Sequence, residues 1–434
     1  MIPITSDLIE NIAMENGIPA LGSASIREIS HLVDLIEAET GIRFVRMEMG
    51  VPGLPAPSVA VEAEIKALKS GMASLYPEIS GIPSLKKEAS RFIRLFLDVI
   101  VNKEGCIPTV GSMMGGMVSF LVANRNDRSK EGTLFIDPGF PVQKQQVKMI
   151  GHDYYSFDVY NFRGTKLKAK LESFLKTGKI SSLLYSNPNN PAWICLTEEE
   201  LSIIGSLAKK YDVIVIEDLA YFGMDFRKDY SRPGVAPYQP TVAHYTDDYI
   251  LLISSSKMFS YAGQRIGIMA ISDHLFNRRY PDLLRYYSTD KFGHSIIFGA
   301  LYGLSAGVTH SAQFGLAALL KAVNDDTYHY RDDLTEYAEK ASIMKNIFLQ
   351  NGFRIVYDMD LNEPIGDGFY FTISYPGMSG RELLGELIRY GVSAISLDIT
   401  GAEREGLRAC VSMVPRDLFN DLEKRLKKFR EDHS

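Results

Sequence analysis

The chain contains little cysteine and no long uninterrupted run of apolar residues. Its 434 residues include three cysteines, which lie far apart at Cys106, Cys195 and Cys410. An odd number of widely spaced thiols argues against a disulfide framework and against a site that binds metal through cysteine alone, so no metal is expected. The N-terminal sequence has neither a basic segment followed by an apolar one nor a run long enough to cross a bilayer. We therefore expect a cytoplasmic protein that does not bind membranes.

The chain also lacks an excess of basic charge. It has 47 Lys and Arg against 53 Asp and Glu, a formal net charge of -6, and its basic residues are scattered along the sequence. A nucleic acid or an anionic membrane would require a basic patch, so neither is expected as a partner. The chain is long enough for one large and one smaller core. A small molecule is the expected ligand.

Short apolar runs alternate with helical patterns over residues 105–270. The runs that we expect to form strands are residues 133–137, 153–157, 180–186, 213–218, 249–255 and 265–272. Strands that alternate with helices of this length are typical of βαβ units and of a mostly parallel sheet. After residue 290 helical patterns dominate, and apolar runs then return beside further helices. The sequence predicts an α/β fold with a large domain, built on a mostly parallel central sheet flanked by helices, and a smaller C-terminal α/β domain.

The helical patterns outside the sheet region suggest how the domains are divided. Helices are expected over residues 26–39 and 58–70, and one helix near residues 310–345 is expected to join the domains. We expect an N-terminal segment, residues 1–48, to pack with the small domain. The large, ligand-binding domain is expected over 49–310 and the small domain over 311–434.

Polar residues follow several of the expected strands. Ligands of doubly wound sheets bind beyond the carboxyl ends of the strands, so these residues are candidates for a site. Phe140 lies in the turn DPGFP, although a phenylalanine is more often part of a core. Asn190 lies in the turn SNPNNP. Asp218 ends the run VIVIED and Tyr221 follows it; a buried carboxylate needs a partner such as a cationic ring nitrogen, although a helix cap would also explain it.

Two further segments suggest a phosphorylated ligand. TVGSMMGG, which contains Ser112 and Met113, precedes an apolar helical run; its backbone N–H groups could bind a phosphate or simply cap the helix. SSSKMFSYAGQRIG places Lys257 after a strand and Arg265 shortly downstream. A lysine that attacks an aldehyde must be desolvated and near a cation, and an arginine can bind a phosphate dianion. Taken singly, each residue could equally be a surface charge.

Taken together, these segments resemble the class I/II aminotransferases, which are fold-type-I pyridoxal-phosphate-dependent enzymes with the aspartate-aminotransferase fold. The match runs in order from about Gly50 to Arg408 and includes Tyr76 with the following GIPSL. The resemblance implies that Lys257 forms the internal aldimine with pyridoxal 5'-phosphate and moves a proton between the substrate Cα and the cofactor C4′. It implies that Asp218 keeps the pyridine nitrogen protonated, so that the ring acts as an electron sink.

The resemblance also assigns the other contacts of the cofactor and the substrate. Asn190 and Tyr221 would hydrogen-bond the phenolic oxygen of the cofactor, and Phe140 would stack on its ring. The phosphate would be held by Ser254, Arg265 and the backbone of Ser112 and Met113. Tyr76 would reach the phosphate of the neighbouring subunit, which implies a homodimer with shared active sites. Gly50, Asn190 and Arg408 would bind the substrate, with Arg408 on its α-carboxylate, although Arg404 lies close to Arg408 in the sequence.

One position departs from the family pattern. Trp193 stands where the usual Asn-Pro-Thr-Gly turn has its glycine, so either the backbone differs there or the indole fills space near the substrate.

The expected activity is transfer of an amino group between an L-amino acid and a 2-oxo acid. A carbon–sulfur β-lyase on the same fold is a second hypothesis, because both reactions begin with deprotonation of Cα and the cofactor motifs do not separate them. A non-catalytic, effector-sensing domain is a third hypothesis, which the short and non-basic N-terminal region disfavours.

Overall fold

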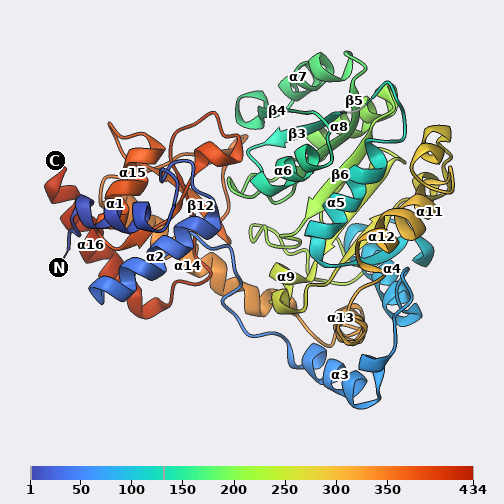
Figure 1. Ribbon diagram of the computed structural model, residues 1–434, viewed down its shortest axis with the longest axis horizontal. Helices are drawn as coiled ribbons and strands as arrows, with labels where there is room; N and C mark the ends of the chain where they lie inside the picture. Colours follow the sequence, from blue (N-terminus) through green and yellow to red (C-terminus); the bar gives the residue numbers. More distant parts are fainter. Residues whose placement is uncertain (1, 131, 434) are drawn as a thin grey trace.

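The computed structural model describes residues 2–130 and 132–433, which form two α/β parts (Figure 1). The larger part contains a seven-stranded sheet with the strand order β2-β8-β7-β6-β5-β3-β4. All neighbouring strands are parallel except that β8 runs antiparallel to β2 and β7. The strands are β2 (Cys106–Thr109), β3 (Gly132–Asp137), β4 (Tyr154–Asp158), β5 (Ile180–Ser186), β6 (Ile214–Leu219), β7 (Tyr249–Ser254) and β8 (Gly267–Ile271). The predicted mostly parallel sheet is therefore confirmed.

Alternate residues of the central strands belong to two different cores. Leu251 and Ile253 pack in one apolar cluster, whereas Ile250 and Leu252 pack in another. Side chains of a strand alternate between the faces of a sheet, so helices must cover both faces. The helices of this part are α4 (Pro83–Leu97), α5 (Gly111–Ala123), α6 (Pro141–Met149), α7 (Lys166–Leu175), α8 (Glu198–Tyr211), α9 (Ser255–Met258), α10 (Asp273–Asn277), α11 (Phe292–His294), a π-helix (Ser295–Leu301) and α12 (Tyr302–Ser305).

The smaller part contains a four-stranded antiparallel sheet with the order β14-β15-β12-β9. Its strands are β9 (Arg354–Ile355), β12 (Tyr370–Ser374), β14 (Ile395–Ser396) and β15 (Leu407–Cys410), and a separate hairpin joins β10 (Met359–Asp360) to β11 (Glu363–Pro364). Its helices are α14 (Tyr330–Gln350), α15 (Gly380–Arg389) and α16 (Phe419–Asp432). This sheet and its helices form the smaller C-terminal α/β part that the sequence predicted.

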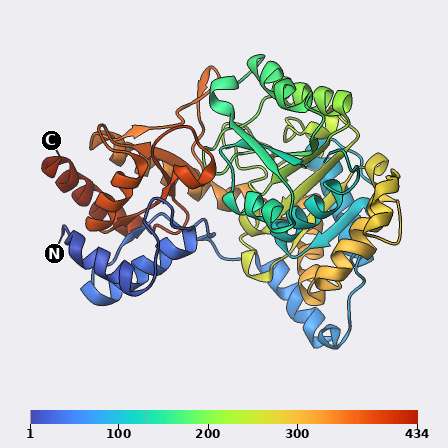
Figure 2. The same cartoon turned by 45° about the horizontal axis from the view of Figure 1, so that its top comes forward.

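The N-terminal segment lies beside the C-terminal part of the chain (Figure 2). It consists of α1 (Ser6–Glu15), α2 (Ile26–Thr40) and β1 (Val45–Arg46), and β1 pairs in parallel with β13 (Val392–Ser393). A capping box between Ser25 and Glu28 fixes the start of α2, because each backbone N–H is accepted by the other residue's side chain. The segment then crosses to the larger part through residues 47–57.

Two expectations about the elements were wrong. Residues 310–345 form two helices, α13 (His310–Asn324) and α14, because Asp326 adopts a left-handed backbone with φ 58° that interrupts the helical path. Helix α13 packs against α3 (Ser58–Lys69) and α4. Strand β2 was not expected, since it has four residues and contains a proline, which is tolerated only at the edge of a sheet.

No helix among residues 2–130 and 132–433 combines the length and the apolar character needed to cross a bilayer.

Candidate active site

The predicted site residues follow strands that end at the same edge of the large sheet. Strands β3, β5, β6 and β7 are mutually parallel, and β2 runs in their direction because two antiparallel steps through β8 separate it from β7. The carboxyl ends of these five strands therefore meet at one edge, which is where open α/β sheets bind ligands. Gly111, Phe140, Asn190, Tyr221 and Lys257 each come shortly after one of them.

Lys257 lies in α9, immediately after β7. The Ser254 hydroxyl caps this short helix by accepting the Ser256 N–H at 3.1 Å, and the Lys257 amine donates to the Gly50 carbonyl. Burial lowers the pKa of Lys257 to about 8, and the positive charges of Arg408 and Arg265 act in the same direction. The side chain is therefore partly neutral near neutral pH, as a nucleophilic amine requires.

Asp218 lies near the end of the central strand β6 and is 6% exposed. Its carboxylate accepts the Gln143 side-chain N–H at 2.8 Å and the Ala220 backbone N–H at 3.1 Å. Burial raises the pKa of Asp218 to about 6, and the hydrogen bonds from Gln143 and Ala220 oppose this shift only in part. A protonated ring nitrogen would supply the missing partner.

Gln143 was not predicted as a site residue. It lies one helical turn after Phe140 on α6, and this spacing places it on the side of the helix that faces β6. Phe140 itself is half-buried at the N-terminus of α6.

Arg265 lies across the N-terminus of α5. A Cβ atom on Gly111 would come within 2.6 Å of the Arg265 Nη2, and one on Gly267 would lie 3.4 Å from the Ser112 N. The first N–H groups of a helix have no partner within the helix, and their dipoles favour an anion. The exposed guanidinium and the first turn of α5, which contains Ser112 and Met113, therefore form a cradle that fits a phosphate.

Arg408 lies on β15 of the small sheet and is 3% exposed. Its Nη1 lies 3.4 Å from the Asn190 Oδ1, its Nη2 donates to the Glu48 carbonyl, and its guanidinium lies 4.7 Å from the ring centre of Tyr370. The structure thus brings Arg408 and Asn190 together. Arg404, the alternative in the sequence, is exposed and lies against the Tyr160 ring at 4.3 Å.

Two tyrosines join the two sheets at this site. The hydroxyl of Tyr221, which follows β6, lies 2.7 Å from the hydroxyl of Tyr370 on β12, and their ring centres are 5.4 Å apart. Burial raises the pKa of both hydroxyls, so both keep their protons. Tyr370 was not predicted, because its place beside Tyr221 depends on packing between distant segments.

Trp193 adopts a left-handed backbone with φ 63° and is fully buried. This is a conformation that glycine adopts readily and that other residues adopt only at a cost. The indole lies 5.4 Å from the Tyr221 ring and 6.1 Å from the Tyr370 ring, both edge-on. A Cβ atom on Gly368 would collide with the indole, so the space that Trp193 fills lies between these tyrosines and Gly368.

Tyr76 lies away from the site of its own chain. It follows a short 3₁₀ helix (Met72–Ser74), and its side chain is 93% exposed.

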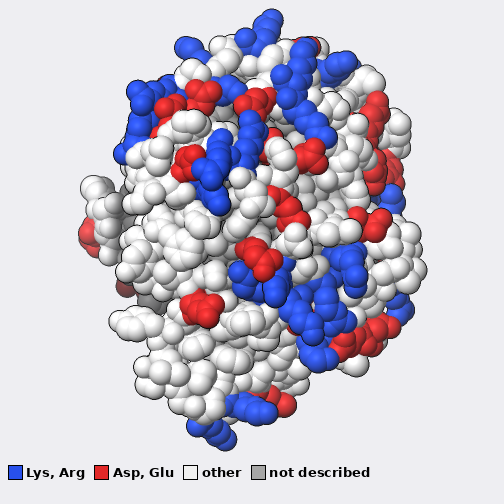
Figure 3. All heavy atoms as spheres, turned by 90° about the vertical axis from the view of Figure 1, so that its right-hand side faces the viewer, with Lys and Arg blue, Asp and Glu red and all other residues white. Residues whose placement is uncertain are grey.

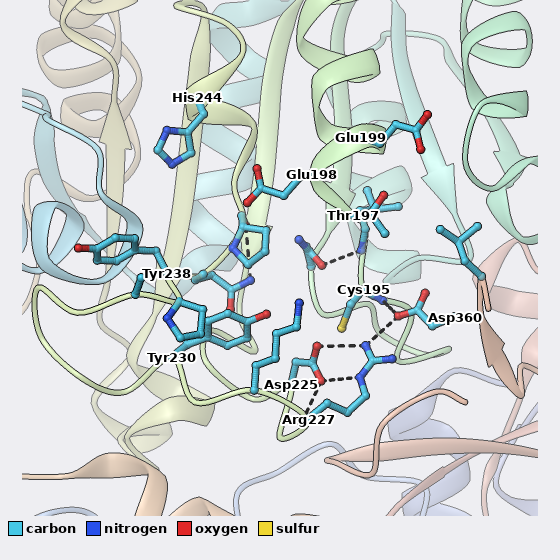
Figure 4. A pocket seen from close by; sticks show the side chains of 18 of the residues that line it. Cys195, Thr197, Glu198, Glu199, Asp225, Arg227, Tyr230, Tyr238, His244 and Asp360 are labelled. Carbon is cyan, nitrogen blue, oxygen red and sulfur yellow. Dashed lines mark hydrogen bonds and ion pairs between the residues drawn. The ribbon is translucent and has the colours of Figure 1, made fainter. Parts of the chain in front are cut away.

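A cavity of about 800 Å³ is lined by none of the predicted site residues. It opens between the start of α8, residues 225–245 and the hairpin of β10 and β11. Figure 4 shows Arg227 among the residues that line it, paired with Asp225 and Asp360. Within residues 2–130 and 132–433, no group of His, Cys, Asp or Glu is arranged to hold a metal ion.

The edge of the sheet offers an amine that is partly neutral, a buried carboxylate without a cation and a cradle for a phosphate. These parts suit a phosphorylated aldehyde with a basic ring nitrogen, and the scaffold around them is the aspartate-aminotransferase fold. Residues 44–422 match the pattern of the family described as Aminotransferase class I and II, so the chain belongs to that family.

One relative is similar in sequence over most of the chain, and two solved structures share the fold. A probable aspartate aminotransferase of Methanocaldococcus jannaschii is 23% identical over 354 residues, which cover 81% of this chain and 84% of that protein. The crystal structure of an aminotransferase from Mycobacterium tuberculosis has a TM-score of 0.77 at 16% identity and covers 96% of this chain and 98% of that one. The alanine aminotransferase of Pyrococcus furiosus has a TM-score of 0.76 at 18% identity, covering 94% and 97%.

Proposed function

We propose that this class I and II aminotransferase holds pyridoxal 5'-phosphate through Lys257 and moves an amino group between an L-amino acid and a 2-oxo acid. The observation that carries the proposal is the buried Lys257 amine, whose pKa is lowered to about 8, at the same sheet edge as Asp218. When bound, the cofactor supplies an electron sink for the electrons of the substrate Cα–H bond.

The residues of the chain then share the acid–base work. Once the substrate amine has displaced it from the cofactor, the Lys257 amine would take the proton from the substrate Cα as general base and return it as general acid. Asp218 would keep the ring nitrogen protonated. Tyr221 and Asn190 would donate hydrogen bonds to the phenolic oxygen, and Phe140 would lie against the ring. Ser254, Arg265 and the first turn of α5 would hold the phosphate.

We also propose that Arg408 binds the substrate α-carboxylate. Its guanidinium is held by the Asn190 side chain, the Glu48 carbonyl and the face of Tyr370, and its Nε has no hydrogen-bond partner within the described part of the chain. A carboxylate would satisfy this buried donor, and the planar fork suits two parallel hydrogen bonds. Gly50 lines the same space, because its carbonyl accepts from Lys257.

The protein is proposed to work as a homodimer with shared active sites. Tyr76 is 93% exposed, and its segment lies against the start of α13, where His310 contacts the Leu75 carbonyl at 3.2 Å. The neighbouring α12 region exposes Phe298 and Tyr302 by about 60% each. Figure 3 looks onto the side that carries α11 and α12 and shows a wide area without charged side chains. Such an area suits an interface between two copies.

A cytoplasmic location is proposed as well. The three cysteines are all free, and Cys106 and Cys410 are buried. Unpaired thiols are typical of proteins that remain in a reducing compartment.

The proposal is tested by the absorption spectrum of the purified protein. We expect a band from the lysine-linked cofactor that is absent in Lys257→Ala. Lys86→Ala is the matched control, since Lys86 is also partly buried with a lowered pKa but lies on α4, away from the site, and its spectrum should match the wild type.

L-amino acids are then added singly without an acceptor. A donor should convert the band to that of the aminated cofactor in the wild type and in Lys86→Ala. Release of pyruvate and ammonia while the band persists would identify a β-lyase instead. A protein that binds no pyridoxal phosphate even when it is added would overturn the proposal.

A further inference from the structure

Tyr370 lies at the centre of the candidate site, yet it belongs to neither the strand ends nor the motifs that predicted the other residues. It is 2% exposed on β12, which with β15 forms the two central strands of the small sheet. Its hydroxyl lies 2.7 Å from that of Tyr221, a residue 149 positions earlier. This contact links the small sheet to the edge of the large one.

The environment of Tyr370 fixes its hydroxyl in place. One face of the ring lies 4.7 Å from the Arg408 guanidinium, and the Trp193 and Phe369 rings pack against it at centre distances of 6.1 and 5.1 Å. A Cβ atom on Gly50 would collide with the hydroxyl. Position 50 therefore leaves room for the hydroxyl only because it is a glycine, and the group cannot swing away without disturbing buried neighbours.

The direction of the hydrogen bond between the tyrosines follows from their protons. Each hydroxyl has one proton to donate, and burial raises the pKa of both, so neither is ionised near neutral pH. In the proposed function the Tyr221 proton points to the phenolic oxygen of the cofactor. The Tyr221 oxygen is then free to accept, and Tyr370 must be the donor.

We propose that Tyr370 is a positioning residue that donates to the Tyr221 oxygen and so holds the Tyr221 proton on the phenolic oxygen of the cofactor. This inference rests on the proposed function. Hydrogen bonds in a chain polarise one another, so a donor behind Tyr221 makes Tyr221 itself a better donor. The chain of two hydroxyls stabilises negative charge on the phenolic oxygen, and it lowers the pH at which the lysine-linked cofactor loses its proton.

Tyr370→Phe in the holoenzyme tests the inference. Phenylalanine keeps the ring that contacts Arg408 and Trp193 and removes only the hydroxyl. We expect the midpoint of the spectral pH titration to rise by about half a pH unit, because the second hydrogen bond of the chain is lost. An unchanged midpoint would overturn the inference.

Tyr357→Phe is the matched control. Tyr357 is 1% exposed, and its hydroxyl bonds Asp158, so this variant also loses a buried hydroxyl but has no contact with Tyr221. Its midpoint is expected to equal that of the wild type, whereas equal shifts in both variants would contradict a specific role of Tyr370.

A double variant distinguishes action through Tyr221 from direct action on the cofactor. Tyr221→Phe alone should raise the midpoint more than Tyr370→Phe does, and adding Tyr370→Phe to it should cause no further shift. Additive shifts would overturn the proposed route. Failure of the proposed function would look different, because the wild type would then show no titrating band at all.

Discussion

Each of the two central side chains of the candidate site, Lys257 and Asp218, lies beside a supporting group from another element. Lys257 and Asp218 each lie at the end of an apolar run, and the parallel sheet places such positions together. Gln143 contacts Asp218 from a helix face, and Tyr370 contacts Tyr221 from another sheet. Neither contact can be inferred from the sequence around these residues, because each depends on how whole elements pack.

The lowered pKa of Lys257 predicts how the protein without cofactor should react with pyridoxal phosphate. Below a pKa of about 8 the amine is mostly protonated, so the rate of linkage should fall about tenfold for each pH unit below that value and level off above it. The rate is followed by absorbance after cofactor is mixed with stripped protein. A midpoint near pH 10.5, the ordinary value for a lysine, would show that the amine is not desolvated.

Trp193→Gly should have two opposite effects on the free energy of unfolding. Removing the buried indole should lower it by about 3–5 kcal/mol, and relief of the left-handed backbone should raise it by about 1 kcal/mol. We expect a net loss of about 2–4 kcal/mol in the free energy of unfolding, measured in urea. Ala306→Gly, at φ 51° and without a large side chain, is the control and should stabilise by up to about 1 kcal/mol. A stabilised Trp193→Gly would contradict the packing role of the indole.

At the scale of elements, the apolar runs of the large sheet predicted six strands to within about two residues at most ends. The apolar runs FRIVYD and SAISLDI also predicted the regions of β9 and β14, although only two residues of each run form a strand. The break between α13 and α14 carries too little pattern to be predicted. We propose that the boundary between the domains, expected at residue 310, lies after α13, because α13 packs against α3 and α4 while α14 packs against β12 and α16.

The hairpin of β10 and β11 is tied to the larger part by a buried network of charges. Asp360 accepts from Arg163 and from Arg227, and it is 6% exposed. Asp360→Asn leaves the buried Arg163 and the half-buried Arg227 with one carboxylate fewer, so we expect a loss of about 1–3 kcal/mol in the free energy of unfolding.

Glu363→Gln on the same hairpin is the control for Asp360→Asn. Glu363 is 63% exposed and lies 3.3 Å from Arg227, and its change should stay within about 0.5 kcal/mol. The free energy of unfolding of both variants is measured in urea. Equal losses in the two variants would show that burial of the charge network adds nothing to stability.

At the scale of the whole molecule, shared active sites predict complementation between two defective variants. Lys257→Ala lacks the amine, and Tyr76→Ala should bind the cofactor roughly 10- to 100-fold more weakly because a hydrogen bond to the phosphate is lost. A mixed dimer contains one site with Lys257 from one chain and Tyr76 from the other. At a cofactor concentration that leaves Tyr76→Ala largely empty, we expect refolded mixtures to show more spectral band and activity than either variant alone.

Two differently tagged chains, co-purified, provide the measurement of complementation. The spectral band and the activity should recover only in the fraction that carries both tags. Recovery in singly tagged fractions, or none in mixed dimers, would contradict the sharing of Tyr76 between subunits.

Arg408 and Tyr370 lie on neighbouring strands of the small sheet, with Tyr370 opposite Cys410 and Thr372 opposite Arg408. Lys257, Asp218 and the phosphate cradle belong to the large sheet. In the proposed function, the arginine that binds the substrate α-carboxylate therefore belongs to one sheet, and the groups that make and break bonds belong to the other. Substitutions in the small sheet can then change how the substrate is held while the reactive groups of the large sheet stay intact.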